Sequence, residues 1–240
     1  MPFIHGKNTT VVWNSTSLTG YLNATDLSVD VDTSDITVYQ QGWKTFIPGL
    51  IDATVGFGGF YDTTAGNLIE AALGVDSGVL TYCPGGGSTI GDRARLVSVT
   101  GTTYSESSPV GDVVTFAWDV HSETVVGLGQ VLHPLGADTN TTTGAEKDDT
   151  AATTTGWVAH LHVTAVSGGS WVVKLQDAAV SNTYTDVTSG AFTAATGATQ
   201  QRLASASGAT LRRYVRYVVT RTGGTAGDTI TFHLSYSRNN

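Results

Sequence analysis

The sequence lacks the residues that cross-link a chain or build long helices. Its 240 residues include one cysteine, Cys83, and one methionine. An intramolecular disulfide is therefore impossible, and stability must come from core packing or from neighbouring subunits. Only 13% of the residues are charged, and runs of Ala, Leu, Glu and Lys are few, whereas long helices are rich in these residues. We expect strands and turns.

Signals for membranes and for catalysis are also missing. Nowhere do about 18 apolar residues follow one another, and the segment MPFIHGKNTT has no basic stretch before an apolar core. We therefore expect neither membrane spanning nor secretion, and a single cysteine fits a reducing cytoplasm. The motifs G-x-S-x-G, H-E-x-x-H, GxxxxGK[ST] and paired C-x-x-C do not occur. Since no set of nucleophile, base and orienting group is visible, we expect no enzyme, no cofactor and no metal.

Charge is unevenly distributed along the chain. The net charge is −8, but residues 1–150 hold 17 acids and 5 bases, while residues 151–240 hold 3 acids and 7 bases. The two parts thus carry −12 and +4. An acidic first part disfavours tight contact with nucleic-acid phosphates.

Before residue 136, several segments alternate between apolar and polar residues, as half-buried strands do. We expect strands near 9–13, 27–32, 54–61, 94–104, 113–120 and 125–132, and one short helix near 63–74. In the strand 27–32, Leu27, Val29 and Val31 form one face and Ser28, Asp30 and Asp32 the other. In the strand 113–120, the expected buried set is Val114, Phe116, Trp118 and Val120.

The stretch 136–156 has almost no large apolar residue and is dominated by Thr, Ala, Asp and Gly, which favours a linker. We therefore divide the chain into a first β domain (1–137), a linker or long loop (138–156) and a C-terminal domain (157–240). The last part has strands near 157–166, 170–177, 213–222 and 229–237, with Gly-Gly turns between them. In 229–237 we expect Ile230, Phe232, Leu234 and Tyr236 to face inward and the polar residues outward. This spacing predicts a small antiparallel sandwich.

Two groups of residues could bind a metal. His160 and His162 share one strand face and can ligate a metal if a third ligand lies opposite, but no Cys or carboxylate cluster accompanies them. A solvated face or a subunit contact is favoured. The acidic residues Glu146, Asp148 and Asp149 lack the D-x-D-x-D-G order of a calcium loop. A flexible acidic loop is favoured there.

Two further groups could bind a polymer. Trp157 and Trp171 could stack on a sugar, yet the alternation assigns Trp171 to the face of Val173 and Leu175, which favours the core. The segment 211–221, LRRYVRYVVTR, mixes bases with aromatic residues, as single-strand-binding surfaces do. In a domain with few other charges, a solvated or subunit-facing strand is the favoured interpretation.

The stretch 42–74 resembles the signature region of the major tail tube proteins of siphophages. That region has a W-x-x-x-I-P-G-L-x-D-A-T segment, a strand that ends in G-F/Y-Y-D, and a short helix. Segments 18–32, 107–119 and 125–134 resemble other parts of the family, so the likeness covers most of residues 8–135. The matching signature residues are Trp43, Ile47, Pro48, Gly49, Leu50, Asp52, Ala53, Thr54, Gly59, Phe60, Tyr61 and Asp62.

The resemblance implies an all-β protein with one short helix: a tail-tube-type sandwich or barrel domain followed by an antiparallel sandwich. It also implies homohexameric rings, stacked into a tube that conducts DNA without binding it specifically. The partners would be copies of the chain itself and the tail terminator, distal tail and tape-measure proteins. The protein would be made in the host cytoplasm and located in the virion.

As a trial assignment, Asp30 and Asp32 line the channel and repel DNA. The alternative is a capsid decoration protein or a fibre-type adhesin whose C-terminal sandwich binds host carbohydrate. An exposed aromatic patch on residues 157–240 would favour that alternative.

Overall fold

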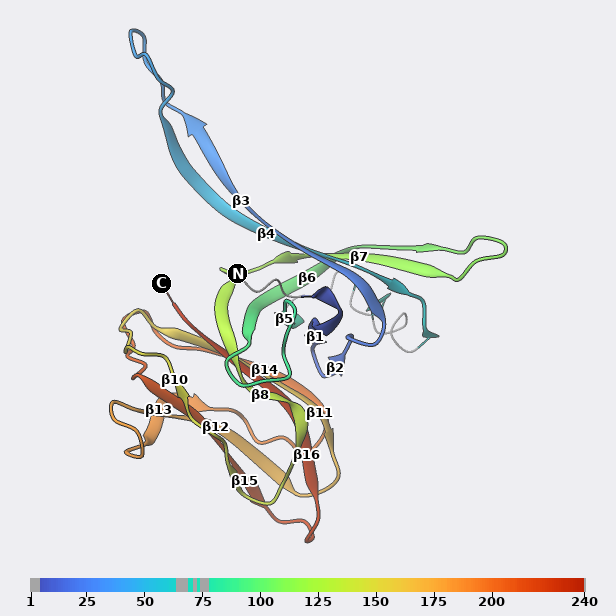
Figure 1. Cartoon of the computed structure of the whole chain (residues 1–240), viewed down its shortest axis with the longest axis vertical. Helices are drawn as coiled ribbons and strands as arrows, with labels where there is room; N and C mark the ends of the chain where they lie inside the picture. Colours follow the sequence, from blue (N-terminus) through green and yellow to red (C-terminus); the bar gives the residue numbers. More distant parts are fainter. Residues whose placement is uncertain (1–4, 64–68, 71–72, 74–77, 240) are drawn as a thin grey trace. The chain divides into compact units, whose positions relative to one another are not determined.

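The computed structural model describes residues 5–63, 69–70, 73 and 78–239 (Figure 1). Strands dominate these residues, and a single 3-10 turn, η1 (Gly6–Asn8), precedes them. The expected all-β fold class is thus confirmed. Most of the helix expected near 63–74 lies outside the described residues, although Thr63, Ile69 and Glu70 are helical. Within the described part of the chain, no helix is long and apolar enough to span a bilayer.

The chain folds as two compact units. Unit 1 comprises residues 1–20, 79–97 and 127–240, and unit 2 comprises residues 21–78 and 98–126. These limits differ from the sequence-based division, because the segments before residue 137 contribute to both units. Whether residues 1–137 act as a tube-forming domain by themselves stays a prediction.

Unit 2 contains a four-stranded antiparallel sheet in the order β3 (Leu22–Asp35), β4 (Phe46–Phe60), β7 (Thr115–Ser122) and β6 (Arg93–Ser107). The strand β6 is shared between the units, and only its residues from 98 onward belong to unit 2. Alternate residues of β4 and β7 are buried, as the period of two requires. The rings of Phe57 and Trp118 stack with their centroids 5.1 Å apart. As expected from the alternation, Phe116, Trp118 and Val120 are buried, but Val114, which precedes β7, is only half-buried.

Unit 1 is a sandwich of two antiparallel layers. One layer has the order β14 (Thr199–Ala204), β11 (Trp157–Val166), β16 (Thr229–Arg238), β8 (Gly127–Thr139), the start of β6, β5 (Gly78–Cys83), β1 (Thr10–Trp13) and β2 (Thr16–Ser17). The other has the order β10 (Lys147–Asp148), β15 (Tyr214–Thr222), β12 (Ser170–Ala178) and β13 (Thr185–Ala191), with β9 (Thr142–Thr143) also paired to β15.

The main core of unit 1 lies between these two layers. Trp157, Trp171 and Phe232 are at most 2% exposed and pack in one apolar cluster, so the core interpretation of the two tryptophans is confirmed. Ile230, Phe232, Leu234 and Tyr236 face this core, as expected.

The opposite face of β16 is not solvated. His233, Ser235 and Ser237 are buried, and the expectation that the polar residues of this strand face outward is wrong. On the same layer, the side chains of His160 and His162 on β11 are hydrogen-bonded to residues at β1 and β5. Residues at β1 and β5 therefore cover a face of this layer that would be predicted as solvent-exposed from the alternation alone.

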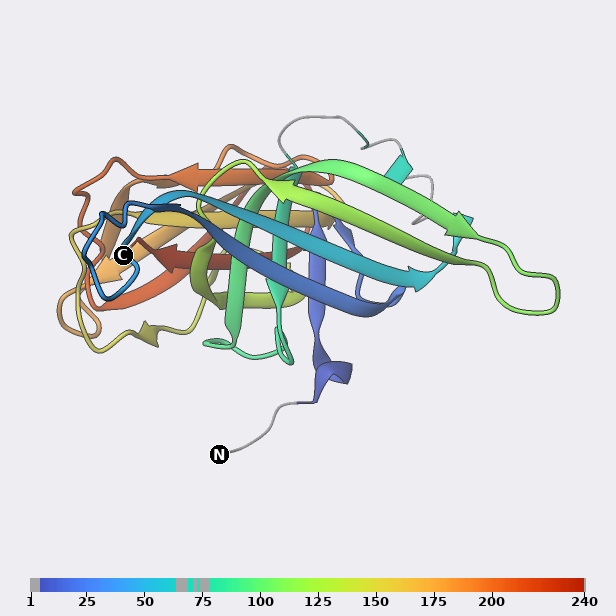
Figure 2. The ribbon, with the colours of Figure 1, turned by 90° about the horizontal axis from the view of Figure 1, so that it is seen from above.

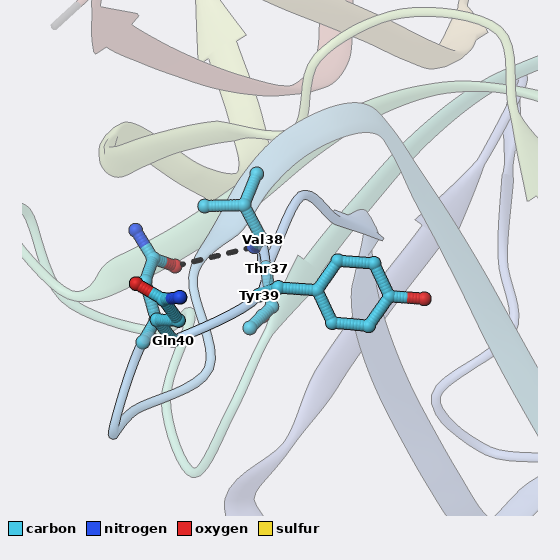
Figure 3. Close-up of a pocket in the computed structure, with 5 residues that line it drawn as sticks. Thr37, Val38, Tyr39 and Gln40 are labelled. Atoms are coloured by element: carbon cyan, nitrogen blue, oxygen red, sulfur yellow. Dashed lines mark hydrogen bonds between the residues drawn. The ribbon is translucent and has the colours of Figure 1, made fainter.

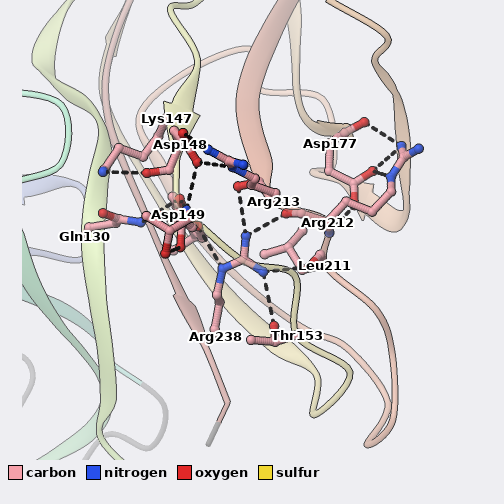
Figure 4. A network of polar contacts seen from close by, with 12 residues as sticks. Gln130, Lys147, Asp148, Asp149, Thr153, Asp177, Leu211, Arg212, Arg213 and Arg238 are labelled. Carbon is pink, nitrogen blue, oxygen red and sulfur yellow. Dashed lines mark hydrogen bonds and ion pairs between the residues drawn. The ribbon is translucent and has the colours of Figure 1, made fainter. Parts of the chain in front are cut away.

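The expected linker is partly structured. It contains β9 and β10, which pair with β15. Asp148 and Asp149 form ion pairs with Arg213 and Arg238 (Figure 4). A flexible acidic loop is therefore the wrong interpretation, because polar bonds order this segment without apolar burial.

Candidate functional site

The outer part of the β3–β4 hairpin forms a two-stranded arm, defined here as residues 29–53. β7 pairs with β4 only from Thr54 to Phe60, so within the described residues the strands of the arm pair only with each other. Figures 1 and 2 show this hairpin as a long ribbon. An isolated two-stranded ribbon is marginally stable in water at best.

Large apolar side chains are concentrated on this arm. Of the 17 large hydrophobic side chains that are exposed in the described residues, 10 lie on it, which marks the arm as an interaction surface rather than an ordinary loop. They are Val29, Val31, Ile36, Val38, Tyr39, Trp43, Phe46, Ile47, Leu50 and Ile51.

Near its base, the arm continues the buried face of the sheet. Val29 lies opposite Ala53, and Val31 lies opposite Ile51, on the face that Val55 shares within the sheet. Ala53 and Val55 are buried, whereas Val29 is 50% exposed and Val31 46% exposed. The predicted alternation is correct in direction, but the expected burial of this face is wrong for Val29 and Val31. The apolar stripe therefore extends from the buried part of the sheet onto exposed positions of the arm.

The tip of the arm is an ordered turn. The side chain and backbone N–H of Thr37 bond to Asp35, and the Val38 N–H bonds to Gln41 Oε1 at 3.4 Å. The bonds from Thr37 lower the pKa of Asp35 below its ordinary value. Residues 37–41 line a small hollow there, and the ring of Tyr39 points away from the turn and is fully exposed (Figure 3). The tip thus presents an aromatic side chain to solvent.

The other face of the hairpin is acidic. Asp30 lies directly opposite Asp52, and Asp26 and Asp119 both lie opposite Gly56, one from each side. These positions alternate with the buried ones, so the four carboxylates share one face. A Cβ added at Gly56 would lie 3.1 Å from Asp119 Oδ1, and the carboxylate therefore reaches across β4.

The charge of the whole unit agrees with this face. Unit 2 carries 12 acids and one base, Lys44, a net charge of −11, whereas unit 1 carries 8 acids and 11 bases, a net charge of +3. On the acidic face, the Nδ1 atom of the His121 ring lies 3.5 Å from Asp52 Oδ2. The asymmetry seen along the sequence is therefore a division between two folded units.

The signature residues lie along β4 and just beyond it. Trp43 is 88% exposed and Leu50 81% exposed, so the first half of the signature is the arm and not a pocket. Gly59 is different, because a Cβ there would lie 2.3 Å from the Tyr21 carbonyl oxygen and 2.8 Å from the Phe116 ring. Ile47, Pro48, Gly49 and Asp52 are exposed on the arm, Phe60 is exposed at the end of β4, and Tyr61 and Asp62 follow it half-buried.

Sequence reasoning found part of the acidic face. Asp30 and Asp32 lie on the arm and are exposed, and their role as channel residues stays a prediction. Asp26, Asp52 and Asp119 were not assigned to this face. The alternation places Asp26 beside Asp30 on one strand, but only the strand register brings Asp52 and Asp119 to the same side.

The other candidate sites do not assemble into a binding surface. In the described part of residues 157–240, Val180 is the sole large hydrophobic side chain that is exposed. Arg212, Arg213 and Arg238 form ion pairs with carboxylates of the same unit (Figure 4). Among the described residues, no group of three or more His, Cys, Asp or Glu side chains is arranged to hold a metal ion.

Comparisons with known proteins give structural matches only. No protein-family description and no curated protein matches the chain. A chain in the virion of a native gene transfer agent particle is 13% identical, with 52% of this chain and 97% of that chain covered and a TM-score of 0.42. The SPP1 tail tube protein is 10% identical, with 51% of this chain and 77% of that chain covered and a TM-score of 0.44. The SPP1 Dit protein is 12% identical, with 96% of this chain and 98% of that chain covered and a TM-score of 0.35. Tail tube and related tail proteins are thus among its structural neighbours, but such identities transfer no residue's role.

Proposed function

We propose that this chain is a structural protein of a bacteriophage tail, a tube subunit that assembles with copies of itself in the virion. The observation that carries the proposal is the arm, whose apolar face continues a buried sheet face and is itself exposed. A second copy of the chain is the proposed occupant. The sequence signature supports this choice, because its first half coincides with the arm.

The energy available from covering the arm is large. Burying an exposed apolar side chain contributes about 1.5 kcal/mol, so the ten side chains on the arm together offer on the order of 10 kcal/mol before the costs of association. Ring closure would also give every exposed strand edge a neighbour. Assembly into stacked, hexameric rings is the form that the sequence resemblance implies.

The acidic face supports a passive role towards DNA. Repeated around a ring, Asp26, Asp30, Asp52 and Asp119 would create a negative wall that repels phosphates. DNA would then pass through the tube without being held, and no chemical step would be needed. Terminator, distal tail and tape-measure proteins are the further partners of this proposal.

The decisive experiment changes the arm while leaving both folded cores intact. We expect the wild-type chain to form rings or tubes in negative-stain micrographs. The triple variant Val29→Thr, Val31→Thr, Ile51→Thr should stay monomeric in sedimentation, because the stripe that continues the buried sheet face has lost its three exposed apolar side chains. The matched control is Val180→Thr, which changes an exposed valine of unit 1 and should assemble normally.

Circular dichroism must show that the triple variant keeps its strands, since threonine favours β structure as valine does. Normal assembly of this folded variant would reject the arm as the assembly surface. A wild-type chain that remains monomeric at all concentrations and binds a glycan would support the adhesin alternative instead.

A further inference from the structure

Three histidines meet inside unit 1, on the face of the layer that the main core does not occupy. His160 and His162 lie on β11, and His233 on β16 is the direct cross-strand neighbour of His162. All three side chains are 0% exposed. The ring centroids of His160 and His162 lie 6.1 Å apart, and those of His162 and His233 lie 6.2 Å apart. Fully buried imidazoles are rare enough to require a reason.

The hydrogen bonds of this cluster assign the protons. His162 Nδ1 lies 2.6 Å from the Asn14 carbonyl oxygen, and His160 Nδ1 lies 3.2 Å from that of Leu80. Because a carbonyl only accepts, both Nδ1 atoms carry hydrogen. Thr81 Oγ1 lies 2.7 Å from His162 Nε2, which is then free to accept the hydroxyl proton. Neutral imidazole rings are therefore sufficient to form all the hydrogen bonds that join β11 to β5 and to the end of β1.

A proton added to His160 or to His233 would lie at a ring nitrogen that has no acceptor. His160 Nε2 and His233 Nδ1 are buried and have no hydrogen-bond partner among the described residues. The charged or titratable neighbours of the three rings are each other, Arg202 on β14, opposite His160, and His133 on β8. These neighbours repel an added positive charge or leave it unpaired.

The electrostatics follow from this geometry. Burial lowers the pKa of His162 to about 4. Burial, with His162 and His133 nearby, lowers the pKa of His233 to about 3. Burial, then His162 and Arg202, lowers the pKa of His160 well below its ordinary value. All three rings are therefore neutral in the folded unit at neutral pH.

We propose that this histidine cluster is an acid-sensitive clasp that holds β1 and β5 against β11, and that protonation releases these strands. Above about pH 6.5 the rings are neutral in both folded and opened states, and the stability that the cluster contributes to the folded state is fully present. Below that pH the opened state binds more protons than the folded one, so the folded state loses stability as pH falls towards the depressed pKa values. This inference concerns unit 1 alone and does not depend on the proposed tail function.

The linkage gives a measurable slope. Each histidine that becomes protonated only on opening increases the opening constant about tenfold in total between pH 6.5 and 5.2. Three such histidines give roughly a thousandfold increase over the same interval. Carboxyl groups of the opened chain take up protons mainly below about pH 5, so the window from pH 6.5 to 5.2 reports on the histidines.

The test is hydrogen–deuterium exchange of the full chain, with opening constants taken for the peptides that cover β1 and β5 and corrected for the intrinsic rate at each pH. We expect the steep slope in the wild type and in the control His121→Gln, which changes an exposed histidine of unit 2. The double variant His162→Asn, His233→Gln cannot be protonated at two of the three sites. Its opening constant should rise only about tenfold in total between pH 6.5 and 5.2.

A wild-type opening constant that does not change between pH 6.5 and 5.2 overturns the proposal, whether or not the double variant folds. An equal slope in a folded double variant also overturns it, because the proton uptake would then belong to other groups.

Discussion

Asp149 joins the segment 138–156, which the sequence pattern predicted to be a linker, to the core of unit 1. Its removal should lower the free energy of unfolding substantially. Its carboxylate accepts hydrogen bonds from Tyr236 Oη and Arg238 Nε, both at 2.7 Å, and from Gln130 Nε2 (Figure 4). The side chains of the Arg238–Asp149 pair are 14% and 8% exposed, respectively. Asp149→Ala would therefore leave a nearly buried cation without its counter-ion and a buried phenol without its acceptor.

The expected magnitude follows from the partners that remain. Removing one member of a buried ion pair costs about 3–5 kcal/mol. Arg238 keeps the carbonyl oxygens of Leu211 and Arg212, each at 2.6 Å, so we expect the lower limit, about 3 kcal/mol. With a urea m-value of about 2 kcal/mol/M, the unfolding midpoint should fall by about 1.5 M.

The matched control is Glu146→Ala, a carboxylate on the same segment. Glu146 is exposed and bonds to the hydroxyls of Ser181 and Tyr184 at the surface, where such contacts contribute less than about 1 kcal/mol. Its midpoint should move by less than about 0.5 M. Urea unfolding followed by tryptophan fluorescence compares the two variants, and equally small shifts would mean that residues 138–156 are a loose linker after all.

Two predictions concern assembly and DNA passage. Replacing Asp30 and Asp32 by Lys should permit assembly, because both side chains are exposed, but should slow DNA ejection at low salt and less at high salt, since phosphate contacts release counterions. Unchanged ejection at both salts, from tubes that contain the variant, would remove these residues from the channel. A chain that ends at Asp138 should lose exchange protection in β8 from Val131 onward, because this part pairs with β16, whereas residues 127–130 also pair with β6. If it forms rings instead, the sequence-based domain division is the functional one.

Alternation along the chain predicted much of the fold. The strands β11 and β16 were expected within one residue of their observed ends, and Phe232 and Leu234 face the core as predicted. The alternation succeeds because a side chain's direction in a strand depends only on its position. It gives the side of a strand on which a residue lies.

Whether that side is buried depends on segments that are distant in the chain, and the sequence pattern did not predict it. Val29 and His162 both follow the alternation, yet the valine is exposed and the histidine is buried. The covering strands of the histidine, β1 and β5, are about 80 to 150 positions away in the chain, beyond the reach of any local pattern. Likewise, Asp149 looked solvated because its partner Arg238 is 89 positions away.

The acidic side of the arm has a consequence for the life of a newly made chain. An exposed apolar hairpin invites indiscriminate pairing between strands and, at high concentration, aggregation. Asp26, Asp30 and Asp52 lie on the reverse of the same two strands, so two arms that meet in the wrong alignment bring like charges together. Such charges act as gatekeepers. In the proposed assembly, they would oppose misaligned pairing of free subunits and favour a correctly aligned encounter.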